Sequence, residues 1–330
     1  MARAAPLWIA PPHRLAGDFD RPVSPDRATV PDLPAARPPT ALRLAAALLA
    51  VYLLWGSTYL AIRVALESIP PFTLGAVRFL LAGGGLYLAL RLRGAPAPRP
   101  REWRTAAITG ALLFVGGNGF VVLGEQWVSS GLVALVVGTM LLWAALFAGA
   151  GGQRSSPGEW AGLVLGFVGI TVLALGGELH GAGLGAVLVV LSPVCWALGV
   201  VLGRRGPLPA GPMAAASQML AGGVALAGLG LVRGEALLAA PSTRSLVALA
   251  HLVVFGSLVG FTAYGYLLRN ARTAVANSYA YVNPIVAIVL GAAVAGEPVG
   301  PVTWLAAAII LSGVAVLGLA RAQPGSRTRA

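Results

Sequence analysis

The stretch Thr273–Pro298, TAVANSYAYVNPIVAIVLGAAVAGEP, is long and apolar, yet polar side chains and a proline lie inside it. A helix of about 20 apolar residues crosses the hydrocarbon core of a bilayer, so the stretch predicts a membrane-spanning helix. Pro284 frees the backbone carbonyl near Ala280 from its hydrogen bond, and hydrocarbon offers no partner for such a group. The helix is therefore predicted to face other helices or a wet cavity, and not lipid on all sides.

The polar residues of this helix divide between two faces. At about 100° per residue, Asn277, Tyr281 and Pro284 share one side. Tyr279 and Asn283 lie nearly opposite. One edge is expected to line a cavity and the other to tie the helix to a neighbour, and the spacing leaves open which edge does which.

The composition is that of a polytopic membrane protein. Of the 330 residues, 57% are hydrophobic and 10% are charged, and the mean hydropathy is +0.82. The formal charge of +12 would suggest nucleic acid in a soluble protein, but the arginines cluster between apolar runs, where they orient a membrane protein. We expect a lipid bilayer as a partner, no nucleic acid and no cofactor. The single Cys195 excludes an internal disulfide and a thiolate metal site.

Apolar runs of about 18 to 22 residues recur from Leu44 onward, and they predict an all-α integral membrane protein with ten transmembrane helices. The expected spans are 44–63, 72–91, 105–123, 130–149, 159–176, 183–203, 211–232, 246–267, 274–295 and 301–319. Residues 1–41 are rich in proline, arginine and aspartate and predict a disordered cytoplasmic tail. Residues 321–330 form a second cytoplasmic tail.

Successive connections between these spans lie on alternate sides of the membrane, and the arginines are distributed unequally between the two sides. One side has only Arg63, Arg233 and Arg244, whereas the other carries most of the rest. By the positive-inside rule, both termini are cytoplasmic. The sequence thus predicts a multi-pass protein of the plasma membrane, the inner membrane in a bacterium, and says nothing of its oligomeric state.

An internal repeat with a spacing of about 140 residues divides the chain. Trp55 is echoed by Trp196, and LLAGG at Leu80–Gly84 by MLAGG at Met219–Gly223. Each repeat holds five spans, and because five is odd the second repeat must enter the membrane upside down. Inverted repeats are typical of secondary transporters that work by alternating access. The predicted repeats cover 42–177 and 182–320.

Several uncharged polar residues fall inside the other spans. Trp55, Thr58 and Tyr59 share one face of the first span. Trp55 lies well inside the span and has an N–H to satisfy, which makes it a candidate for a cavity wall, whereas Thr58 can equally bond to its own helix. Asn118 is flanked by glycines, and its amide suits either a solute or a neighbouring helix.

Charged residues are scarce within the spans. Arg78 lies some six residues inside the second span and either braces the bundle or contacts an anionic substrate group. Proton antiporters commonly use a carboxylate at mid-membrane. The glutamates here lie at span ends or in loops, which favours a facilitator or exchanger unless Glu125 or His251 carries a proton.

Five motifs closely resemble the EamA-type family of the drug/metabolite transporter superfamily, in its YedA-like branch. They are WGSTYLAIR at 55–63, PPFTLGAVRFLLAG at 70–83, EQWVSSGL at 125–132, SYAYVNP at 278–284 and GEP at 296–298. The resemblance covers Leu48–Leu319 and implies two EamA domains, a central cavity and export of small metabolites or amino acids. Two departures concern the first half, which has Leu141 where the family tends to have proline and Gln153 where an acid is usual, so it is expected to bend less.

The leading hypothesis is a secondary transporter, acting as an exporter of a small metabolite, amino acid or drug-like solute. The alternatives are a membrane enzyme acting on lipid-linked substrates and a passive channel or scaffold. An enzyme would need clustered acids, histidines or a metal site, whereas those residues are scattered here, so no catalytic or metal-binding residue is predicted. The candidate substrate-binding residues are Trp55, Thr58, Tyr59, Asn118, Tyr281 and Asn283, and the structural or gating candidates are Arg78 and Pro284.

Overall fold

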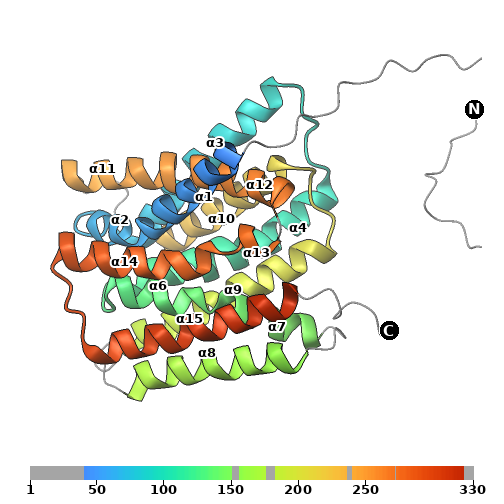
Figure 1. Cartoon of the computed structure of the whole chain (residues 1–330). Coiled ribbons are helices and arrows are strands. Elements are labelled where there is room, and N and C mark those ends of the chain that lie inside the picture. The colour runs from blue at the N-terminus through green and yellow to red at the C-terminus, as the bar shows by residue number, and fades with distance from the viewer. Residues whose placement is uncertain (1–40, 151–155, 176–182, 236–239, 272, 323–330) are drawn as a thin grey trace, which may run out of the picture. The chain divides into compact units, whose positions relative to one another are not determined.

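The computed structural model describes residues 41–150, 156–175, 183–235, 240–271 and 273–322, and these form helices joined by short connections (Figure 1). The all-α prediction is confirmed for this part of the chain. The predicted tails lie outside the described residues, except for Ala41 and the end of the last helix. Gln153 lies outside them as well.

The helices are α1 Ala41–Gly56, α2 Thr58–Ala65, α3 Pro71–Leu92, α4 Pro100–Gly110, η1 Ala111–Gly119, α5 Phe120–Gly124, α6 Ser130–Gly138, α7 Met140–Ala150, α8 Pro157–Leu175, α9 Leu184–Arg205, α10 Pro212–Val232, α11 Thr243–His251, η2 Leu252–Val259, α12 Gly260–Asn270, α13 Thr273–Ala276, α14 Tyr279–Ala295 and α15 Pro301–Ala322. The segments η1 and η2 are π-helical. We call α1 to α8 the N-terminal half and α9 to α15 the C-terminal half.

Within the described residues, eight helical segments are long and apolar enough to cross a membrane. The apolar stretches Pro157–Leu173 and Tyr279–Ala295 are shorter. The structure thus confirms eight of the predicted spans by length and composition. At the other two predicted positions it has these shorter apolar helices.

The predicted span 274–295 is broken at Asn277–Ser278, between α13 and α14. The N–H of Ala280 bonds three residues back, to Asn277 O at 3.1 Å, as in a tight turn. Pro284 lies inside α14 and cannot bond to the carbonyl of Ala280. Gly138 of α6 comes so close that a Cβ there would lie 3.3 Å from this carbonyl oxygen, so a neighbouring helix covers the freed group.

The fourth predicted span is interrupted even though it has Leu141 at the position where the resemblance implies a proline. The break falls at Thr139, between α6 and α7. Its Oγ1 donates to Val136 O at 2.6 Å, the kind of local bond by which threonine bends a membrane helix. The helix is therefore interrupted here at a threonine, and the expectation that the first half bends less at this point stays a prediction.

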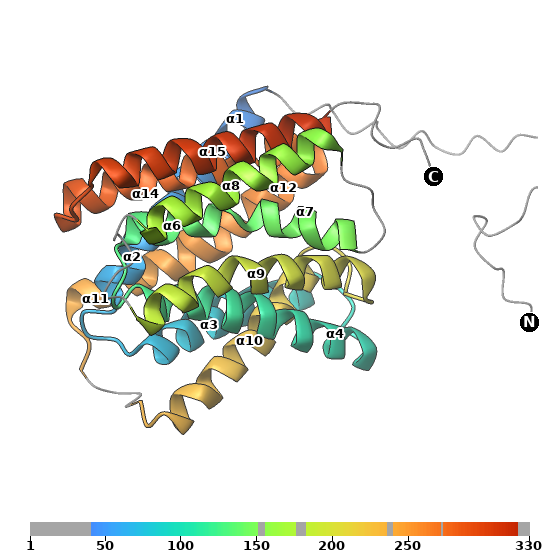
Figure 2. The same ribbon diagram turned by 90° about the horizontal axis from the view of Figure 1, so that it is seen from below.

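Helices of the N-terminal half pack mainly on helices of the C-terminal half. Figures 1 and 2 show α8 running along α15, and α3 along α10. α6 packs on α14, and α9 packs on η1. The contact between α8 and α15 is a backbone contact, because a Cβ at Gly313 would lie 2.6 Å from Gly166 N. The two halves are therefore interleaved.

Two carboxylates of the C-terminal half cap helices of the N-terminal half. Glu235, after α10, accepts hydrogen bonds from Thr73 N at 2.8 Å and Thr73 Oγ1 at 2.9 Å, at the start of α3. Glu297, after α14, accepts from Ser130 N at 3.0 Å and Ser130 Oγ at 2.9 Å, at the start of α6. A negative charge is favourable at a helix N-terminus. Both caps lie at the end of the bundle that holds the connections after α2, α5, α10 and α14, which we call the arginine-poor end.

The two π-helical segments begin about 140 residues apart, which is the spacing of the sequence repeat. π-Turns are frequent at functional sites. In both segments a backbone carbonyl oxygen accepts a hydrogen bond from a side chain of another helix. Gly256 O in η2 accepts from Trp55 Nε1 at 3.1 Å. Gly117 O in η1 accepts from Ser192 Oγ at 2.9 Å, so α1 and α9 dock in comparable ways on the opposite half.

Candidate functional site

A cavity of about 80 Å³ lies between the two halves. All of the sequence candidates except Tyr281 line it, although their part in substrate binding stays a prediction. The candidates at its wall are Trp55, Thr58, Tyr59, Arg78, Asn118, Asn283 and Pro284. The sequence did not propose the other lining residues, which are Ile62, Val121, Ala134, Val137, Gly138, Met140, Trp196, Gly256, Phe261, Tyr279 and Ala280.

Tyr281 points away from the cavity. Its hydroxyl donates to Val314 O of α15 at 2.8 Å. On the same edge of the helix, Asn277 Oδ1 accepts from the Tyr264 hydroxyl at 3.0 Å. This edge therefore ties α14 to its neighbours and the opposite edge lines the cavity. Pro284, which shares the side of Asn277 and Tyr281 by helical periodicity, is also at the cavity wall.

The uncharged polar groups of the cavity are partly bonded within the protein. Trp55 Nε1 is satisfied by Gly256 O. Thr58 Oγ1 donates to Trp55 O at 2.6 Å, so this threonine bonds to its own chain and lines the cavity as well. Asn118 Nδ2 donates to Leu113 O at 3.3 Å. That bond leaves the Asn118 carbonyl oxygen as the acceptor that a solute can use.

Asn283 joins α14 to α1. With its amide nitrogen turned toward two carbonyl oxygens, Asn283 donates to Tyr52 O at 3.2 Å and to Tyr279 O at 3.3 Å. The residue is buried, and breaking the bond to Tyr52 would leave a polar group in an apolar surrounding. Asn283 thus connects the cavity wall to the packing of the two halves.

Arg78 is the cationic residue of the cavity wall. It is 5% exposed. Its Nε donates to Ser257 Oγ at 3.1 Å, and its guanidinium lies 4.9 Å from the centre of the Phe79 ring. The ion pairs found among the described residues, Arg63 with Glu297 and Arg244 with Glu67, do not include it. The positive charge of Arg78 is therefore available to an anionic group in the cavity.

Aromatic rings line the cavity near the break between α13 and α14. The Trp55 ring lies 4.9 Å from that of Tyr279 and 5.5 Å from that of Phe261, measured between centroids. Tyr264 packs behind them, 5.2 Å from Trp55. These four residues, which we call the aromatic cluster, come from α1, α12 and α14.

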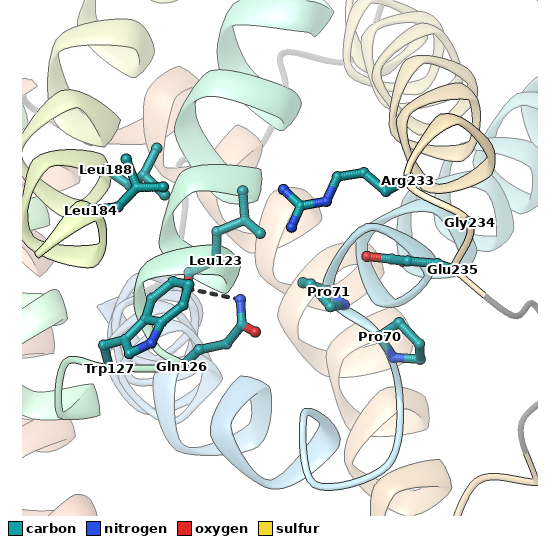
Figure 3. A pocket seen from close by; sticks show the side chains of 10 residues that line it. All are labelled: Pro70, Pro71, Leu123, Gln126, Trp127, Leu184, Leu188, Arg233, Gly234 and Glu235. Atoms are coloured by element: carbon teal, nitrogen blue, oxygen red, sulfur yellow. Dashed lines mark hydrogen bonds between the residues drawn. The ribbon is translucent and has the colours of Figure 1, made fainter. Parts of the chain in front are cut away.

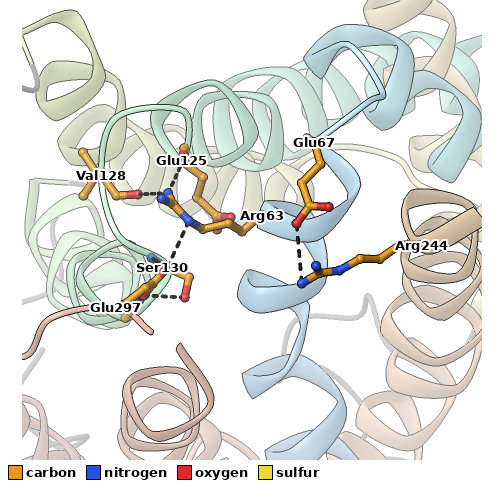
Figure 4. A network of polar contacts seen from close by, with 8 residues as sticks. Arg63, Glu67, Glu125, Val128, Ser130, Arg244 and Glu297 are labelled. Carbon is orange, nitrogen blue, oxygen red and sulfur yellow. Dashed lines mark hydrogen bonds and ion pairs between the residues drawn. The ribbon is translucent and has the colours of Figure 1, made fainter. Parts of the chain in front are cut away.

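A polar network lies at the arginine-poor end of the bundle (Figure 4). Arg63 of α2 pairs with Glu297, Nε to Oε1 at 3.3 Å, and its Nη1 donates to the backbone carbonyl of Glu125 at 2.9 Å. The carboxylate of Glu125 is buried, and neither of its oxygens has a hydrogen-bond partner. His251 lies near the same end, with Nε2 3.1 Å from Ser57 Oγ.

A second, larger cavity of about 330 Å³ opens at the arginine-poor end (Figure 3). Arg233, Glu235, Gln126 and Trp127 are among its lining residues, and none of the sequence candidates is. Glu235 is already engaged as the cap of α3. Among the described residues, histidine, cysteine and acidic side chains do not gather in groups of three or more that could hold a metal ion.

Comparisons with known proteins agree with the geometry. The model of the EamA-like transporter family matches residues 43–175 and again residues 183–319. The chain is 43% identical over 281 residues to "Uncharacterized inner membrane transporter YedA" of Escherichia coli, a match that covers 85% of this chain and 92% of that protein. It is 30% identical over 280 residues to "Probable terminal-alkyne amino-acid exporter" of Streptantibioticus cattleyicolor, covering 82% of this chain and 92% of that protein.

A solved crystal structure has the same fold. It is 22% identical in sequence, gives a TM-score of 0.59, and the match covers 84% of this chain and 97% of that one. The likeness at this identity concerns the fold alone.

Proposed function

This chain belongs to the EamA-like transporter family, and on that premise we propose that its small-solute transport works by alternating access of the cavity between the two halves. The chain is a membrane transporter of small solutes. In our proposal, ten spans form two inverted repeats of five, over 42–177 and 182–320, with both termini in the cytoplasm. The matched roles of η1 and η2 support the repeat, and the arginine distribution supports the orientation.

The observation that carries the proposal is a small cavity walled by both halves. Its volume of about 80 Å³ holds a few waters. A metabolite needs more room, so the halves have to move for it to enter. In our proposal, Trp55, Phe261 and Tyr279 gate the cavity toward one side, and the network of Arg63 and Glu297 forms the gate toward the other. Alternate opening of these two gates would carry a solute across.

We infer that the solute is small and amphipathic and carries a carboxylate. Arg78 offers an uncompensated guanidinium, which binds carboxylates strongly. Trp55, Phe261 and Tyr279 offer aromatic surface for an apolar side chain. An amino acid with an apolar side chain has both groups, and one relative is named as an exporter of amino acids of terminal-alkyne type. Export is the direction we propose here too.

The alternatives explain the cavity less well. A membrane enzyme would need reactive groups that converge, and apart from Arg78 the groups at the cavity wall are apolar or hydrogen-bonding ones. A passive channel would need a continuous path, whereas the cavity between the halves has a volume of only about 80 Å³. A transporter that is not an enzyme therefore fits the site best.

Counterflow in proteoliposomes tests the proposal. We expect vesicles that are loaded with unlabelled L-leucine and contain the purified protein to accumulate labelled L-leucine transiently, with saturable kinetics. Leucinamide, which lacks the carboxylate, should compete at least about tenfold less well, because it forms no ion pair with Arg78. Flux that rises linearly with concentration would support a channel, and equal competition by the amide would remove the carboxylate from the proposal.

A further inference from the structure

Glu125 is buried at the arginine-poor end without a partner for its carboxylate. It follows the last residue of α5, its exposed fraction is 1%, and both carboxylate oxygens lack a hydrogen bond. Its own backbone is held, since Arg63 Nη1 bonds to its carbonyl oxygen (Figure 4). An ionised carboxylate in such a place loses its hydration and gains no hydrogen bond, so the neutral form is favoured.

The charged groups around Glu125 do not compensate for the hydration that its ionised carboxylate would lose on burial. On α2, Arg63 is paired with Glu297, and Tyr59 is a phenol. On α3, Arg78 acts on Glu125 through its charge, but the two residues are not within ion-pair distance. Glu297, from the connection after α14, repels a second negative charge. α9 packs on α5 with apolar groups, such as Val189 against Gly124.

Burial, and next the repulsion by Glu297, raise the pKa of the Glu125 carboxyl well above 4.5, its ordinary value. Arg63 and Arg78 oppose this shift without cancelling it. In the conformation described here, the carboxyl group thus holds a proton under conditions in which an exposed glutamate has lost it.

We propose that Glu125 is a proton-binding site that couples solute transport to a proton gradient. As the arginine-poor end closes, the carboxylate takes a proton from the water on that side and holds it in the conformation described here. When the opposite end opens and water reaches the carboxyl through the cavity, the proton leaves to that side, so one proton moves inward for each solute exported. The proposal rests on the proposed function and deepens it. It departs from the expectation of a facilitator or exchanger, to which Glu125 was the stated exception.

Thermal unfolding of the detergent-purified protein, followed from pH 5 to pH 8, tests the protonation without any solute. A group whose pKa is raised by folding stabilises the fold at low pH, and this stabilisation is lost as the pH rises toward the folded-state pKa. We therefore expect the unfolding temperature of the wild type to fall with pH by several degrees more than that of Glu125→Gln, which mimics the protonated form at every pH.

Glu67→Gln is the matched control, because Glu67 lies at the same end but is 46% exposed and paired with Arg244. This variant should keep the pH slope of the wild type. If the curves of wild type and Glu125→Gln run parallel, Glu125 titrates like an exposed carboxylate and the proposal is wrong.

Flux measurements test the coupling. In leucine counterflow without a gradient, Glu125→Gln should retain at least about half of the wild-type rate, because a neutral side chain suits the closed state. An imposed pH gradient should accelerate wild-type flux several-fold and leave this variant unchanged. Wild-type counterflow that ignores the gradient would overturn the coupling alone. Absence of leucine counterflow would overturn the proposed function and the coupling with it, and the unfolding curves would still report the protonation.

Discussion

Replacement of Arg78 by glutamine is expected to weaken the apparent affinity for L-leucine by about 30- to 150-fold. Arg78 is the buried cation of the cavity wall. Its guanidinium forms one side-chain hydrogen bond in the described residues, from Nε to Ser257 Oγ. A hydrogen bond to a charged group contributes about 2 to 3 kcal/mol when the alternative is an unpaired charge, which corresponds to this loss. The affinity is read from the concentration dependence of counterflow.

Two controls separate binding from folding. Arg78→Lys keeps the charge but loses the planar, two-pronged geometry, so we expect a loss within about tenfold. Leucinamide should bind equally weakly to the wild type and to Arg78→Gln, because it has no carboxylate to pair with the guanidinium of Arg78. If Arg78→Gln is folded and takes up leucine with wild-type affinity, the arginine only braces η2 through Ser257.

Replacement of Gly313 by leucine should destabilise the bundle by at least about 3 kcal/mol, because overpacking a tight contact forces the backbone to move. A Cβ at this position would lie 2.6 Å from Gly166 N and 2.8 Å from Gly162 O, so α8 and α15 would have to separate. The change is measured as a lower unfolding temperature of the purified protein and a smaller yield in the membrane.

Gly228→Leu is the matched control for this substitution. Gly228 lies in α10 and is exposed, and a Cβ added there would meet no other atom within 4 Å. On a membrane helix such a position meets lipid, where leucine is well suited. We expect an unfolding temperature within a degree or two of the wild type. If Gly313→Leu were equally mild, the close approach of α8 and α15 would not exist in the membrane.

The sequence predicts the helical class and most of the spans because both depend on local composition. Apolar runs of membrane-crossing length carry their own signal. The polar residues inside them also pointed to the cavity, since a buried tryptophan or asparagine in a membrane helix needs a partner or a solute. Trp55 and Asn118 were found in this way, and Trp196 could have been, because it echoes Trp55 in the repeat.

Other features depend on contacts between distant parts of the chain and leave no local pattern. The periodicity of α14 separates its two edges, but only the packing of α15 shows that Tyr281 faces Val314 and not the cavity. The π-helical segments η1 and η2 lie within apolar runs. An ordinary α-helix would have the same apolar composition there, so the sequence does not distinguish the two. Glu125 lies at the end of a span in the sequence, and only the structure shows that it is buried, next to α5, on which α9 and α3 pack.

Alternating access of the cavity is the central claim, and the accessibility of one cysteine tests it most directly. Ala134 of α6 lines the cavity and is 1% exposed, so Ala134→Cys places a small thiol at the wall. The protein has a single native cysteine, which Cys195→Ser removes. A membrane-impermeant thiol reagent is then applied to intact cells and, separately, to inverted membrane vesicles. The account predicts reaction from both sides of the membrane, slowed in both cases by L-leucine, and reaction from one side only, whatever the solute, would contradict it.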